Sequence, residues 1–186
     1  MIVLSLSFIK VEIGEYGVHW NFFMTLGSLP LLLYLATKAT QSPTKLCILA
    51  CGLLSVYELL LHLGLQSILL TAPRTNLITQ NKEGLSSLLG YFCTFLFSIK
   101  IGETIRQKET SFIQLLPLLT IVMNLLNSFL PCSRRFSNSV YVFWILTSNT
   151  WMLYGFSKLT RGVPMMLNAI NRNQLATFMI VLYLCF

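Results

Sequence analysis

Aspartate is absent from this sequence, and charged residues of any kind are scarce. All six acidic residues are glutamate, and Asp, Glu, Lys and Arg make up 10% of the 186 residues, against about 25% in soluble domains. The class of soluble proteins with a fully solvated surface is excluded, because 55% of the residues are hydrophobic and the mean hydropathy is +0.71. We therefore expect a single membrane domain over residues 1–186, with membrane lipid as a partner.

Several soluble-enzyme and metal-binding motifs are also missing. The chain has no Gly-x-Ser-x-Gly elbow, no glycine-rich phosphate loop, no Cys-x-x-Cys pair and, without aspartate, no His-x4-Asp acyltransferase box. With two histidines and no acidic cluster, we expect no metal site and no bound cofactor. The net charge is +7, but the basic residues are scattered in short loops, a pattern that fits lipid headgroups and not nucleic acid.

Long apolar runs account for most of the chain, and they predict an all-α transmembrane bundle. Lipid leaves no partner for exposed backbone groups, so each run must be helical. A sixth run, Gln174–Phe186, is too short to span, and both ends of the chain resemble cuts, which predicts a fragment of a larger polytopic protein. Five runs have spanning length: Val18–Ala36, Leu46–Leu70, Leu85–Ile101, Phe112–Leu130 and Ser139–Phe156.

The loops between these runs divide into two sets by charge. If all five runs span, residues 71–84 and 131–138 share one membrane face with the N-terminal flank. The other face carries more Lys and Arg and is therefore the expected cytoplasmic side.

Glu58 and His62 lie four residues apart within the second apolar run, and hence on one helical face. Ionisable groups in hydrocarbon are costly, so we expect both to point into the bundle. They predict either a polar wall that binds a headgroup or relays protons, or hydrogen bonds that hold helices together.

Four segments of the sequence carry a family resemblance. They are Glu15-Tyr16-Gly17-Val18-His19-Trp20-Asn21-Phe22-Phe23, Asn81-Lys82-Glu83-Gly84 with Gly90-Tyr91, Arg134-Arg135 with Asn138 and Tyr141-Val142, and Asn168-Ala169-Ile170-Asn171-Arg172-Asn173-Gln174-Leu175. In these segments the chain resembles the glucosaminyl-phosphatidylinositol inositol acyltransferases, the PIG-W family, which includes the fungal GPI-anchored wall transfer proteins.

The resemblance implies a multi-pass enzyme of the endoplasmic reticulum membrane. Such an enzyme transfers a fatty acyl group, usually palmitoyl, from acyl-CoA as co-substrate to the inositol of glucosaminyl-phosphatidylinositol, the GPI precursor. Only the later part of the family's length is matched, so this fragment alone is expected to be inactive. The alternative is a non-catalytic scaffold or a transporter-like fragment; a transporter would show inverted repeats with broken helices, which the sequence lacks.

Within this resemblance, His19 is the candidate catalytic residue, as general base or hydrogen-bond donor. Arginine grips phosphate with two parallel hydrogen bonds, so Arg134 and Arg135 are candidates for the inositol phosphate. The alternatives are a solvated loop for the arginine pair and a structured helix start for His19 and Asn21. The full candidate substrate-binding set, expected to line a cleft at the lumenal face, comprises Asn21, Asn81, Lys82, Glu83, Arg134, Arg135 and Asn138, with Glu58 and His62 deeper in the membrane.

Overall fold

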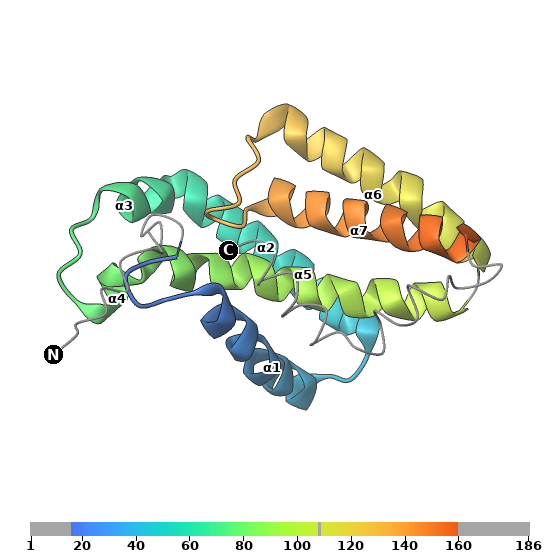
Figure 1. Cartoon of the computed structure of the whole chain (residues 1–186), viewed down its shortest axis with the longest axis horizontal. Helices are drawn as coiled ribbons and strands as arrows, with labels where there is room; N and C mark the ends of the chain where they lie inside the picture. The colour runs from blue at the N-terminus through green and yellow to red at the C-terminus, as the bar shows by residue number, and fades with distance from the viewer. Residues whose placement is uncertain (1–15, 108, 160–186) are drawn as a thin grey trace, which may run out of the picture. The chain divides into compact units, whose positions relative to one another are not determined.

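A computed structural model describes residues 16–107 and 109–159, and the described part of the chain is helical without any strand. The chain forms two compact units, of which the first ends at Asn149 and the second begins at Thr150. All packing described below belongs to the first unit. The helices are α1 (Phe22–Ala39), α2 (Pro43–Leu60), the π-helical turn η1 (Leu61–Leu65), α3 (Gln66–Thr71), α4 (Leu77–Gln80), α5 (Lys82–Gln107), α6 (Glu109–Phe129) and α7 (Ser139–Leu159) (Figure 1).

The core of the first unit lies where α2 and α5 run side by side (Figure 1). Small side chains allow the close approach: Ala50 and Cys93 are both fully buried within this cluster. Close packing through small residues is how membrane helices associate, because lipid supplies no hydrophobic drive between them. Val142 and Leu146 of α7 complete the same cluster.

Asn21 starts α1 by accepting a hydrogen bond from the Met24 N–H at 2.9 Å. This N-cap satisfies one of the donors that a helix leaves unpaired at its first turn. The helix then packs on α5 through one face, on which Thr25, Leu29 and Ala36 are buried, while most of its other large apolar side chains are exposed. Exposed apolar side chains of this kind are expected on a lipid-facing helix.

A backbone break at Gly64 interrupts the second apolar run, for which the sequence predicts an uninterrupted span. Gly64 has φ +117° inside η1, so the chain bends between α2 and α3. Only glycine adopts this conformation without strain, and π-helical turns are a recognised cause of sharp helix kinks. The expected helix of spanning length over Leu46–Leu70 is present, and the kink at Gly64 divides it into two parts.

Three helical segments of the described chain are long and apolar enough to cross a membrane: Phe22–Ala39, Pro43–Thr71 and Lys82–Gln107. Ile113–Phe129 is apolar but shorter. The expected all-helical membrane bundle is thus confirmed, while crossing by all five predicted runs stays a prediction. The sixth run, Gln174–Phe186, lies outside the described residues.

The connector predicted over residues 71–84 contains structure of its own. A capping box at Asn76 and Thr79 starts the short helix α4, and α5 then begins at Lys82, three residues earlier than the apolar run. At its other end α5 continues to Gln107, through most of the connector predicted over residues 102–111. Charged residues thus extend the helix beyond its apolar part at both ends.

Candidate functional site

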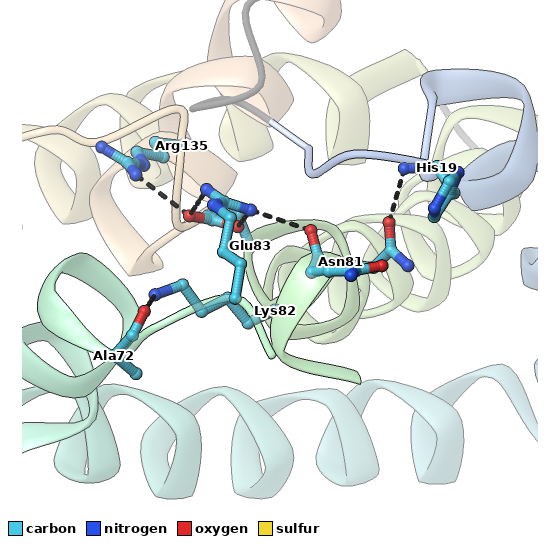
Figure 2. Close-up of polar contacts among 8 residues, drawn as sticks. His19, Ala72, Asn81, Lys82, Glu83 and Arg135 are labelled. Carbon is cyan, nitrogen blue, oxygen red and sulfur yellow. Dashed lines mark hydrogen bonds and ion pairs between the residues drawn. The ribbon is translucent and has the colours of Figure 1, made fainter. Parts of the chain in front are cut away.

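Three segments that carry the family resemblance meet in space at the start of α5 (Figure 2). Asn81 joins the first two: its side-chain oxygen accepts the backbone N–H groups of His19 and Trp20, both at 2.8 Å, and its amide donates to the Leu77 carbonyl. Two backbone hydrogen bonds add to this junction, from Val18 to Gln80 and from Gly84 to Tyr16. The third segment, residues 131–138, is joined to α5 through Glu83 (Figure 2).

Two glycines permit this close approach. Gly17 has φ +129°, and a Cβ on it would lie 2.6 Å from the Asn81 backbone. A Cβ on Gly84 would lie 2.2 Å from the Trp20 ring. Both distances are far below van der Waals contact, so the motif glycines are explained by packing between the segments.

Glu83 is fully buried and pairs with two arginines from different loops. Its Oε1 lies 2.6 Å from Arg74 Nη2 and 3.1 Å from Arg135 Nη2, and its Oε2 accepts a further bond from Arg74 Nη1 at 3.1 Å. A buried carboxylate needs such partners, because its transfer out of water costs on the order of several kcal/mol. Glu83 and Arg135 therefore hold loops together in this structure.

Two other candidates also bind the protein's own backbone. Lys82 is buried and donates from Nζ to the Ala72 carbonyl at 2.6 Å (Figure 2). Asn138 is buried, accepts from the N–H groups of Ser133 and Tyr141, and donates to the Pro131 carbonyl. The segments are therefore in contact with one another, and the predicted cleft and a substrate-binding role for these side chains stay predictions.

The segment between α6 and α7 is folded into the bundle. Tyr57 of α2 donates its hydroxyl to the Phe136 carbonyl, and a Cβ on Gly90 would lie 2.0 Å from the Ser137 carbonyl oxygen. Gly90 lies eight residues into α5, about 12 Å along the helix axis. Irregular backbone at this depth is tolerated only where protein surrounds it or where it lines a cavity.

Glu58 supplies a hydrogen-bond acceptor for one backbone N–H at the end of this segment. Its Oε2 accepts the Ser139 N–H at 2.8 Å, at the positive N-terminal end of α7. Its side chain is 16% exposed, so the expectation that it points into the bundle is confirmed. His62 differs: its Nε2 lies 3.7 Å from Glu58 Oε1, but its side chain is 58% exposed, and the inward orientation predicted for it is wrong. His62 lies two residues before the backbone break at Gly64, and the sequence pattern did not reveal this break.

An apolar groove of about 780 Å³ opens between α1, α5 and the start of α7. We call it the α1/α5 groove. Its α5 wall is formed by Tyr91, Thr94, Phe95 and Ser98, which share one helical face. The end nearest the converging loops carries polar groups from three segments: Tyr16, Tyr91, Arg134 and Tyr141.

Arg134 is the predicted site residue that lines this groove, and it is exposed. His19 and Asn21 are also exposed, in the segment that leads into α1. The tyrosines at the polar end were not predicted as site residues. Tyr91 and Tyr141 meet edge to face at 6.3 Å, and Tyr141 stacks on Trp144 at 6.2 Å. Their proximity depends on tertiary packing, although Gly90-Tyr91 and Tyr141-Val142 in the resemblance were a signal for them.

Comparison with known proteins identifies the family. The family model described as GWT1 matches residues 3–181. The chain belongs to the GWT1 family. Among GWT1-family relatives, it is 31% identical to GPI-anchored wall transfer protein 1 of Cryptococcus neoformans, over 95% of this chain and 38% of that protein. It is 36% identical to the phosphatidylinositol-glycan biosynthesis class W protein of Dictyostelium discoideum, over 91% of this chain and 37% of that protein.

A further GWT1-family relative, GPI-anchored wall transfer protein 1 of Candida albicans, is 30% identical over 89% of this chain and 43% of that protein. The chain thus spans about two fifths of the length of these curated relatives. Membership of the family that the sequence resembles is confirmed, and the segments of the resemblance that the structure describes meet at the start of α5.

Proposed function

We propose that this chain forms the later part of an acyltransferase of GPI-anchor biosynthesis, in the endoplasmic reticulum membrane. The reaction is transfer of a fatty acyl group from acyl-CoA to the inositol of glucosaminyl-phosphatidylinositol. Family membership over residues 3–181 is the observation that carries this proposal. The names of relatives, which refer to GPI-anchored wall transfer and to phosphatidylinositol-glycan biosynthesis, support it.

The α1/α5 groove supplies a site suited to the lipid acceptor. Its volume of about 780 Å³ falls in the range of small-molecule sites, and its walls are largely apolar. A phosphatidylinositol lipid carries an anionic phosphate between apolar chains and a sugar-like ring. Arg134 at the polar end matches the phosphate, and the neighbouring Tyr91 and Tyr141 rings match the headgroup.

In the reaction, an inositol hydroxyl attacks the thioester carbonyl, its proton passes to a base, and the thiol of CoA leaves. The His19 imidazole remains this chain's candidate for the base, because a ring nitrogen can accept a proton. Its backbone is fixed by the Asn81 side chain, which places the histidine beside the converging loops. The oxyanion of the intermediate requires positioned donors.

The contact between the start of α5 and the segment after α6 supports a return crossing of the membrane by α6. Glu83 lies at the start of α5 and pairs with Arg135, which follows α6. The chain must therefore come back along α5 between Gln107 and Arg135. The 21 residues of α6 extend about 31 Å, enough to cross the hydrocarbon core.

The proposed function is tested by rescue of cells that lack the inositol acyltransferase. The chain and a version extended to the length of its relatives are expressed, and glucosaminyl-phosphatidylinositol from each is treated with a phospholipase C that requires a free inositol 2-hydroxyl. Acylated product resists this cleavage. Resistance with the extended chain, reduced at least about tenfold by Arg134→Ala, is expected; fully cleavable lipid from well-expressed extended protein would refute the function.

A further inference from the structure

A second apolar groove lies between α2, α5, α6 and the start of α7. We call it the α2/α6 groove, and it encloses about 510 Å³. Its walls are formed mainly by apolar side chains: Leu54, Leu59, Phe97, Val122, Leu126 and Phe143. Phe97 and Phe143 pack with ring centroids 5.5 Å apart, which joins the α5 and α7 walls.

The polar end of this groove is built by Glu58 and Ser139. Ser139 is 6% exposed, and its hydroxyl is buried without a hydrogen-bond partner among the described residues, while its backbone N–H donates to Glu58. An unmet buried hydroxyl is costly, so a ligand that accepts from it gains the bond at little expense. The Glu58 carboxylate beside it disfavours a phosphate or a free carboxylate at this position.

We propose that the α2/α6 groove binds the acyl chain of a long-chain acyl thioester, with the thioester carbonyl accepting a hydrogen bond from Ser139. The proposal rests on the acyltransferase function above and assigns its acyl donor a site. A thioester carbonyl accepts hydrogen bonds, so it can pair with the Ser139 hydroxyl. It is also uncharged, so the adjacent Glu58 carboxylate does not repel it. Val122 and Leu126 line the groove one helical turn apart on α6, and Leu130, just past the end of that helix, extends the apolar wall for the chain.

The two grooves end close together on α7. Ser139 closes the α2/α6 groove and Tyr141 lines the polar end of the α1/α5 groove, and both belong to the first turn of this helix. Phe143 faces the α2/α6 groove while Trp144 and Ile145 face the other, so α7 separates the two apolar bodies. A carbonyl at Ser139 and a headgroup at Tyr141 would thus lie at the same end of α7 but on different sides of it.

Photolabelling of the purified chain in detergent tests this site without requiring turnover. The probe is palmitoyl-CoA with a diazirine in the acyl chain, and the labelled peptides are identified by mass spectrometry. Label is expected in α2 and α6 around Glu58 and Leu126, with competition by unmodified palmitoyl-CoA. A diazirine-bearing free palmitate is expected to label these positions less, because its carboxylate meets Glu58.

Matched variants on one helix distinguish the groove from general lipid contact. Val122→Phe fills the groove and is expected to reduce labelling about tenfold, whereas Ile121→Phe, at a 64% exposed position, leaves it unchanged. Ser139→Ala is expected to weaken competition by unmodified palmitoyl-CoA about fivefold, the loss of one hydrogen bond. Monodisperse elution verifies that each variant is folded.

Label confined to α1 and the α1/α5 groove, equal labelling of Val122→Phe and Ile121→Phe, or preferential labelling by a diacyl phosphatidylcholine probe would each overturn the assignment. Acyl transfer is measured separately with the extended chain. Specific labelling of α2 and α6 without any transfer would refute the acyltransferase function while the acyl site stands, so the two failures are distinguishable.

Discussion

Glu83 shows how a buried charge can serve the fold. It makes its ion pairs to Arg74 and Arg135 with no exposed surface of its own, whereas both arginines retain some exposure. Removing one member of a buried pair leaves the remaining charge uncompensated. The carboxylate is therefore expected to contribute to stability far more than any surface ion pair of this chain.

Replacement of Glu83 by alanine tests that contribution. Glu83→Ala is expected to destabilise the chain by about 3–5 kcal/mol, because two arginines lose their counter-charge. Glu103→Ala is the matched control on the same helix, since its pair with Lys100 is about one third exposed, and it should cost less than about 1 kcal/mol. Thermal aggregation followed by size-exclusion chromatography in detergent provides the measurement; equal melting curves for both variants would contradict the expectation.

Arg134 and Arg135 are adjacent in sequence but are expected to respond differently to mutation. Arg134→Ala should weaken binding of phosphatidylinositol about tenfold, because Arg134 lines the α1/α5 groove. Arg135→Ala should lower the melting temperature, because Arg135 pairs with buried Glu83. Native mass spectrometry of retained phosphatidylinositol, alongside thermal stability, separates the two effects, and reversed effects would argue against both assignments.

At the scale of elements, the kink at Gly64 is the main departure from regular helices. A Cβ at Gly64 meets open space, so any cost of substitution comes from the backbone, which has φ +117°. Gly52 of α2 also has open space but lies in regular helix. The two positions therefore separate conformational strain from steric clash.

Alanine at each of these glycines gives a direct comparison. Gly64→Ala is expected to destabilise the chain by about 1–2 kcal/mol, or to straighten η1, because a Cβ is strained at this φ. Gly52→Ala should stabilise the chain by up to about 1 kcal/mol through helix propensity. Thermal denaturation in detergent distinguishes the signs, and a gain in stability for both variants would show that the kink is not required.

The helices and the converging loops are largely predictable from sequence, whereas the grooves are not. Apolar runs of spanning length indicate helices because lipid admits little else, and charged or polar pairs such as Glu83 and Arg135 mark the loops. The kink at Gly64 is missed because an isolated glycine is common inside apolar helices and does not by itself indicate a break. The α1/α5 groove depends on how Phe95 and Trp144 pack in three dimensions, which no local pattern specifies.

At the scale of the whole molecule, the loop contacts predict a common membrane face. Cysteines at position 78, a 70% exposed site, and native Cys132 should react with an impermeant maleimide from the same side of sealed vesicles, because Glu83 and Arg135 join their loops. A cysteine replacing Ser42, after α1, should be protected from that side. The other native cysteines are replaced beforehand, and labelling of positions 78 and 132 from opposite sides would contradict this topology.

The ion pairs of Glu83 also have a consequence for biosynthesis. Arg74 precedes Glu83 by nine residues, so a partner is already made when the ribosome completes the start of α5. Arg135 follows 52 residues later and is synthesised only after α6. The carboxylate can thus enter the bilayer interface already neutralised, while its second partner arrives with the return of the chain. The buried carboxylate therefore gains its full set of partners only after the chain has returned past α6.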